Sequence, residues 1–174
     1  DGHPFTAEDI VFMFEAMNRN DNISTWAEYP GLDRIIAIDD YTLRYECDQP
    51  FPALVNNLAS WAGSEWTAFA PKHYLEKWHI DYNDNANELA KEEGFDEWWE
   101  AFQYHFGPDP TRDINKPTMM PWMFSQLTTT VKAFERNPYF YQVDIEGNQL
   151  PYVDYVTVSI VDKEVYQTKI LSGE

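Results

Sequence analysis

The sequence predicts a mixed α/β (α+β) fold in which helices and strands alternate along the chain. Near the start, Ile10, Phe14 and Met17 recur at the spacing of one helix face. Near the end, alternate residues of the stretch 153–161 are apolar, which is typical of a strand. With 174 residues, 44% of them hydrophobic, the chain is long enough to bury one ordinary core or two small lobes.

The first elements are a helix and a hairpin. Thr6 is the expected N-cap of a helix that contains Ile10, Phe14 and Met17. Residues 34–48 alternate between apolar and polar on either side of the turn signal Asp39-Asp40, which predicts a β-hairpin. Cys47, the single cysteine, cannot form an internal disulfide, and we expect it to pack in the core of this hairpin.

Further elements follow from periodicity and from proline and glycine breakers. In the middle of the chain we expect short helices at 51–58 and 72–78, helical segments within 87–106 broken at Gly94, and an extended proline-rich connection at 107–121. After it we expect a strand at 129–135, a turn at 146–148, a strand at 153–161, and a closing helix between Asp162 and Gly173.

The charge balance excludes two classes of partner. Thirty acidic residues against twelve basic ones give a formal net charge of -18, which repels nucleic-acid phosphates and anionic lipid headgroups. No apolar run approaches the roughly 18 residues that a membrane-spanning helix needs. We therefore expect no binding of nucleic acid.

Catalytic patterns are weak. Carboxylate pairs such as Glu97 with Glu100, or Asp39 with Asp40, carry little weight among thirty acids, so a hydrolase is only an alternative. The four histidines are scattered without zinc-ligand spacing and are expected at the surface or at helix ends. There is no nucleophile elbow and no glycine-rich phosphate loop, so we expect no enzyme activity, no catalytic residue and no cofactor.

A calcium-loop pattern is present but incomplete. Asp81, Asn83, Asn85 and Glu92 occupy positions one, three, five and twelve of such a loop, with Asn87 at position seven. Alanine stands where the sharp turn requires glycine. We expect no bound metal, and we keep a calcium-stabilised interaction domain as an alternative.

Several motifs together carry a resemblance to a known family. They are Asp1-Gly2-His3-Pro4-Phe5-Thr6-Ala7-Glu8-Asp9-Ile10-Val11-Phe12, Ile38-Asp39-Asp40-Tyr41-Thr42-Leu43, Ala70-Pro71-Lys72-His73, Glu135-Arg136-Asn137-Pro138-Tyr139-Phe140-Tyr141, Gly147-Asn148-Gln149-Leu150-Pro151-Tyr152-Val153-Asp154 and Lys169-Ile170-Leu171-Ser172-Gly173-Glu174. In this order they resemble the family-five extracellular solute-binding proteins of ABC importers, which include the oligopeptide- and dipeptide-binding proteins. Met119-Met120-Pro121-Trp122 departs from the glycine-rich stretch that this family often has there.

The resemblance implies a fold and a division of the chain. It implies a lobe fragment of the class II periplasmic-binding-protein type, comprising a small subdomain and part of one lobe. Residues 1–115 would form the small subdomain, with a helical insertion at about 81–108, and residues 116–174 would supply return strands and a helix to the main lobe. Members are several times longer, so the rest of the protein, including any signal segment, is expected to lie outside this chain.

The resemblance also implies a function. Such proteins bind oligopeptides or similar solutes in a cleft between lobes and deliver them to the permease subunits of an ABC importer in the membrane. An oligosaccharide ligand is the alternative within the same family. By position, we expect Trp26, Tyr29, Trp61 and Trp122 to face the ligand, because aromatic rings give large contact areas. The implied location is extracytoplasmic, either periplasmic or as a cell-surface lipoprotein.

Overall fold

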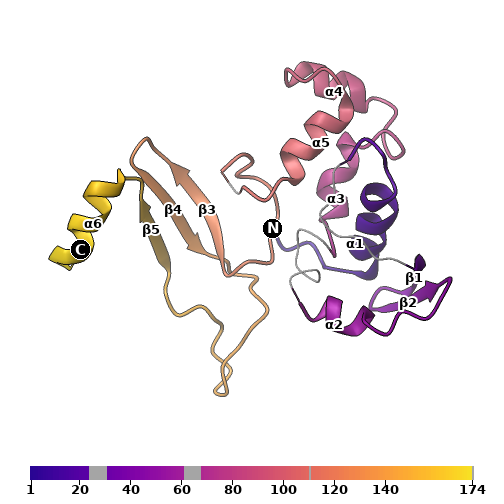
Figure 1. Ribbon diagram of the computed structural model, residues 1–174, viewed down its shortest axis with the longest axis horizontal. Helices are drawn as coiled ribbons and strands as arrows, with labels where there is room; N and C mark the ends of the chain where they lie inside the picture. The colour runs from indigo at the N-terminus through magenta and orange to yellow at the C-terminus, as the bar shows by residue number, and fades with distance from the viewer. Residues whose placement is uncertain (24–30, 61–67, 110, 174) are drawn as a thin grey trace. The chain divides into compact units, whose positions relative to one another are not determined.

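The computed structural model describes residues 1–23, 31–60, 68–109 and 111–173. The chain divides into two compact units, Asp1–Thr118 and Met119–Glu174. Both units contain helices and strands, as Figure 1 shows, which confirms the predicted mixed α/β class. No helix of the described segments is long and apolar enough to cross a membrane.

The first unit begins with the helix predicted after Thr6. Helix α1 (Ala7–Phe12) starts at this residue, and the carboxylate of Asp9 accepts the Thr6 backbone N–H at 2.8 Å. An acidic side chain in the first turn also favours the positive end of the helix dipole. The helix then widens into the π-helix η1 (Met13–Asn18), which the apolar spacing did not indicate.

The predicted hairpin is confirmed. Strands β1 (Leu32–Asp39) and β2 (Thr42–Cys47) pair antiparallel, and Leu32 and Ile35 form a buried cluster with Phe14 of η1. Cys47, however, is exposed, so its expected core position is wrong. It pairs with Leu32 at the open end of the hairpin. Alternation along a strand predicts which residues share a face, but not how much of that face the helical residues such as Phe14 cover.

The remaining elements of this unit are helical. They are α2 (Leu54–Leu58), α3 (Lys72–Leu75), the 3-10 helix η3 (Glu76–Trp78), α4 (Ala86–Glu92) and α5 (Trp98–Phe106). Gly94, with φ at +92°, separates α4 from α5 in the left-handed region that glycine tolerates best, as its sequence position indicated. Trp78 and Phe102 share the main core with Phe12 and Met17.

The second unit is a three-stranded antiparallel sheet followed by a helix. Strands β3 (Trp122–Leu127), β4 (Val131–Arg136) and β5 (Tyr155–Ser159) lie in that order, and helix α6 (Lys163–Ser172) follows Asp162 and ends at Gly173. Residue patterns predicted all of these except β3. Its run Trp-Met-Phe does not alternate, and its pairing with β4 is irregular between Phe124 and Gln126.

Candidate functional site

Of the four predicted ligand-facing residues, Trp122 lies in the described part of the chain. Trp26, Tyr29 and Trp61 fall outside the described residues. Trp122 is the half-buried first residue of β3 and pairs with Arg136 of β4. Its indole Nε1–H donates to the Val153 carbonyl at 2.9 Å, which ties β3 to the segment that leads into β5. The polar atom of Trp122 is therefore committed to the fold of its own unit.

The segment proposed as a calcium loop takes another conformation. Residues 86–92 form α4, so Glu92 ends a helix instead of closing a twelve-residue loop. Oδ1 of Asn83 accepts the Asn85 N–H, and Oδ1 of Asn87 accepts the Trp98 N–H, both at 3.0 Å. In the described ranges, no group of three His, Cys, Asp or Glu side chains is arranged to hold a metal ion. The geometry gives the calcium alternative no support.

The carboxylate pairs considered for hydrolysis serve local structure. Glu100 accepts the backbone N–H groups of Asp96 and Glu97 at 3.0 and 3.3 Å, ahead of the first turn of α5. Asp39 accepts the Tyr41 N–H at 2.9 Å in the hairpin turn, and this bond holds the pKa of its carboxyl below the usual value. Such contacts are those of helix-capping and turn-forming acids.

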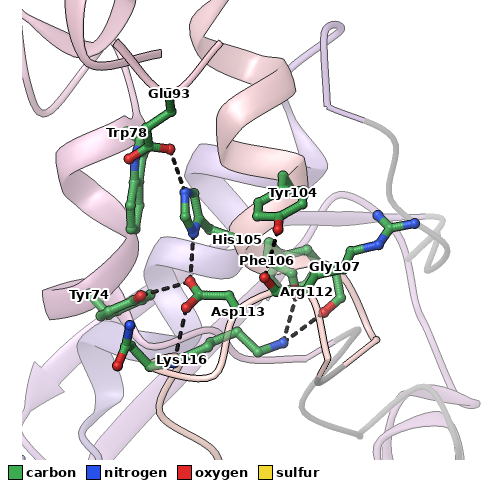
Figure 2. Close-up of polar contacts among 11 residues, drawn as sticks. Tyr74, Trp78, Glu93, Tyr104, His105, Phe106, Gly107, Arg112, Asp113 and Lys116 are labelled. Carbon is green, nitrogen blue, oxygen red and sulfur yellow. Dashed lines mark hydrogen bonds and ion pairs between the residues drawn. The ribbon is translucent and has the colours of Figure 1, made fainter. Parts of the chain in front are cut away.

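The densest set of interacting polar side chains surrounds His105 of α5 (Figure 2). Its side chain is 11% exposed and stacks on Trp78, with ring centroids 3.6 Å apart. Nε2 lies 2.7 Å from a carboxylate oxygen of Glu93, and Nδ1 lies 2.5 Å from one of Asp113. Each ring nitrogen of His105 thus faces a carboxylate.

Asp113 lies at the centre of this network, as Figure 2 shows. It accepts the Tyr74 hydroxyl at 2.7 Å in addition to the His105 ring. Burial alone would raise the pKa of Asp113, but the hydrogen bonds from Tyr74 and His105 outweigh burial and lower it. Burial and the bond to Asp113 raise the pKa of Tyr74.

Lys116 binds the segment after α5, which also contains Asp113, to the C-terminal end of that helix. Its ammonium donates to the carbonyls of Phe106 and Gly107 at 2.9 and 2.7 Å. A cation at a helix C-terminus satisfies carbonyls without helical partners and favours the negative end of the dipole. Together with Asp113, it holds the connection after α5 against the helical core of the first unit.

This network is a structural tie more than a catalytic arrangement. An aspartate-oriented histidine activates a nucleophile only if its other nitrogen faces a hydroxyl or thiol. Here the other nitrogen of His105 faces Glu93. Sequence patterns did not indicate this network, because its members Tyr74, Glu93 and Asp113 are far apart in the chain and follow no motif spacing.

His79 corrects the expectation that the histidines lie at the surface or at helix ends. It is fully buried, with Nε2 2.9 Å from the Ala16 carbonyl and Nδ1 3.2 Å from the Asp81 N–H. These partners require a neutral ring with its proton on Nε2. Burial lowers the pKa of His79. The ring fills core space and satisfies a carbonyl of the π-helix.

Comparison with known families shows to which family the chain belongs. The model of the bacterial extracellular solute-binding proteins, family 5 Middle, matches residues 1–174. The chain belongs to this family. Family 5 consists of solute-binding proteins of ABC transporters, so the resemblance drawn from the motifs is confirmed.

Two solved structures resemble the chain over nearly its whole length. An oligopeptide-binding protein OppA is 33% identical, with a TM-score of 0.84 over 99% of this chain and 27% of that protein. The periplasmic binding protein MelB of Agrobacterium fabrum C58, solved with stachyose, is 23% identical with a TM-score of 0.71, over 99% of this chain and 24% of MelB. The expected periplasmic-binding-protein fold is confirmed.

A further relative is named for a sugar ligand where OppA is named for a peptide one. The periplasmic alpha-galactoside-binding protein of Rhizobium meliloti (strain 1021) is 27% identical over 163 residues, which are 88% of this chain and 20% of that protein. The chain thus spans about a fifth to a quarter of the length of these relatives.

Proposed function

We propose that the full-length protein is the extracytoplasmic substrate-binding component of an ABC importer. It captures oligopeptides or similar solutes in a cleft between lobes and delivers them to the permease in the membrane. The observation that carries this proposal is the family match over residues 1–174. In this proposal the protein is not an enzyme. The energy for transport comes from the importer.

A peptide ligand is favoured by the likeness to OppA, at 33% identity and a TM-score of 0.84. In this proposal residues 1–115 belong to the small subdomain and residues 116–174 to the main lobe. Trp26, Tyr29, Trp61 and Trp122 face the cleft, where rings bury large areas at low entropic cost. The solute selects the closed arrangement of the lobes through contacts that the open form lacks.

An oligosaccharide ligand is the second candidate. The alpha-galactoside-binding relative matches 88% of the chain, and the ligand in its name is a sugar. Aromatic rings serve peptide and sugar sites alike, so the seven tryptophans of this chain suit either ligand class.

Isothermal titration of the full-length protein discriminates the two. Mixed di- to octapeptides form one panel, and stachyose, other alpha-galactosides and cello-oligosaccharides form the other. Saturable heat with peptides supports the peptide reading, and heat with sugars alone transfers the proposal to carbohydrate uptake. If folded protein gives no binding heat with either panel at saturating concentrations, both ligand classes are contradicted. Only the family relationship then remains.

A further inference from the structure

Two histidine rings lie face to face where the N-terminal segment meets α3. His3 belongs to the segment that precedes α1, and His73 lies in the first turn of α3. Their ring centroids are 3.8 Å apart, and the ring planes are inclined by 11°. Nε2 of His73 also lies 2.8 Å from a carboxylate oxygen of Asp1. We call these three residues the histidine joint.

Side chains hold residues 1–5 in place. The histidine joint lies at one end of this segment, and at the other end Phe5 packs edge-to-face on Phe69, with ring centroids 5.0 Å apart. Within the described ranges, no backbone group of residues 1–5 bonds to another element. The first backbone bond to a distant element comes from the Ala7 N–H, which donates to the Asp40 carbonyl at 2.7 Å. Losing the histidine joint would therefore remove one of the contacts on which the segment depends.

The hydrogen bonds of the joint suit two neutral rings. Carboxylates and carbonyls only accept hydrogen bonds, so His73 carries its proton on Nε2, facing Asp1. His3 carries a proton on Nδ1, which lies 3.0 Å from the Pro4 carbonyl. Nδ1 of His73 is buried and, among the described residues, has no hydrogen-bond partner. Protonation of His73 would create a charged N–H at this nitrogen, where no acceptor faces it and burial excludes water.

The surroundings of His73 oppose its protonation on balance. Burial, followed by the adjacent His3 ring, lowers the pKa of His73. The carboxylates of Asp9 in α1 and Glu76 in η3 act in the other direction, and the α-amino group of residue 1 acts in the same direction as burial. If both rings were protonated, two like charges would be stacked at 3.8 Å and would repel each other.

We propose that the histidine joint is an acid-sensitive switch, which holds residues 1–5 on α3 while both rings are neutral and releases them in mildly acidic solution. The release is local, because α1 and α3 stay joined through Asp9, whose carboxylate accepts the N–H groups of Thr6 and Lys72. The switch does not depend on the identity of the solute, since its contacts lie within the first unit.

Fluorine NMR of the full-length protein tests this proposal. Para-fluorophenylalanine in place of Phe5 reports through its fluorine resonance whether that ring is packed, between about pH 8 and about pH 5. His73→Gln keeps an amide donor but does not titrate, and His3→Phe keeps a stacked ring without its charge. His105→Gln is the matched control, because it removes a titrating ring of the same unit whose hydrogen bonds lie elsewhere.

We expect the fluorine resonance of the otherwise unsubstituted protein to move toward its value in a free peptide as the pH falls below about 6.5, before circular dichroism shows global unfolding. At about pH 5 the unpacked fraction should be at least about tenfold larger than in His73→Gln, with an intermediate value in His3→Phe. The His105→Gln control should follow the unsubstituted protein. A resonance that stays constant over this range, or that moves to the same extent in His73→Gln, would overturn the proposal. A change that coincides with global unfolding would overturn it as well.

Discussion

The buried carboxylate of Asp9 accepts the backbone N–H of Lys72 at 3.0 Å, which joins the first turn of α1 to the first turn of α3. Its other oxygen accepts the Thr6 N–H at 2.8 Å. The Asp9 carbonyl also accepts the Ala70 N–H at 3.1 Å. One residue of the family-like opening motif thereby fixes two helix starts that are distant in sequence.

Replacing Asp9 should destabilise the protein. Asp9→Asn keeps one acceptor oxygen and turns an amide NH2 toward a backbone donor, so one buried N–H loses its partner, at a cost of about 1–3 kcal/mol. The matched control is Glu8→Gln, whose carboxylate is 54% exposed and pairs with the Lys72 ammonium at 2.8 Å. We expect that change to stay within about 0.5 kcal/mol in urea unfolding. Equal effects of the two substitutions would contradict the tie.

His79 should make stability depend on pH. Burial lowers its pKa in the folded state, so the unfolded chain binds the proton more readily. The contribution of the neutral ring is complete above the unfolded value near 6.5 and is lost as the pH falls toward the lower folded value, by at most about 1.4 kcal/mol per pH unit. His79→Gln can still donate to the Ala16 carbonyl but does not titrate. The variant should therefore show a flatter stability profile between pH 7 and pH 5, and unchanged slopes would refute the assignment.

Asp113 should also make stability depend on pH, here through its ionised carboxylate. Hydrogen bonds from Tyr74 and His105 lower its pKa in the folded state despite burial, so its contribution is present above about 3.8 and is lost as the pH falls through the folded value. Asp113→Asn should cost about 2 kcal/mol at pH 7 and progressively less in acid. Asp84→Asn, at an exposed turn position, serves as the control. A pH-independent effect of Asp113→Asn would mean that the lost packing, and not the charge, matters.

Elements with a local signal were predictable from the sequence, and features set by tertiary contacts were not. Four predicted helix boundaries lie at the expected residues, because each of these residues has a local preference for such a position: Thr6, Pro71, Gly94 and Gly173. Strand β3 was missed because its apolar residues are adjacent, and its strand conformation depends on pairing with β4.

The candidate site was less predictable for the same reason. His79 reads as polar in sequence, yet it is buried because the Ala16 carbonyl and the Asp81 N–H satisfy both ring nitrogens. The network in which His105 contacts Glu93 and Asp113 joins residues that no spacing rule connects. The ligand-facing role of Trp122 came from the resemblance, and it stays a prediction.

That role of Trp122 can be separated from its structural one by two substitutions in the full-length protein. Trp122→Phe removes the N–H that donates to the Val153 carbonyl but keeps an aromatic face, and should cost about 1 kcal/mol of stability. Trp122→Ala removes both, and if the ring stacks on the solute it should also weaken binding about tenfold or more. Leu127→Ala, an exposed position on the same strand, is the control for effects on β3. Titration calorimetry with whichever solute binds, alongside thermal unfolding, separates the two roles. An unchanged Kd for Trp122→Ala, in protein that remains folded, would remove Trp122 from the cleft and leave it as the residue that ties β3 to the segment before β5.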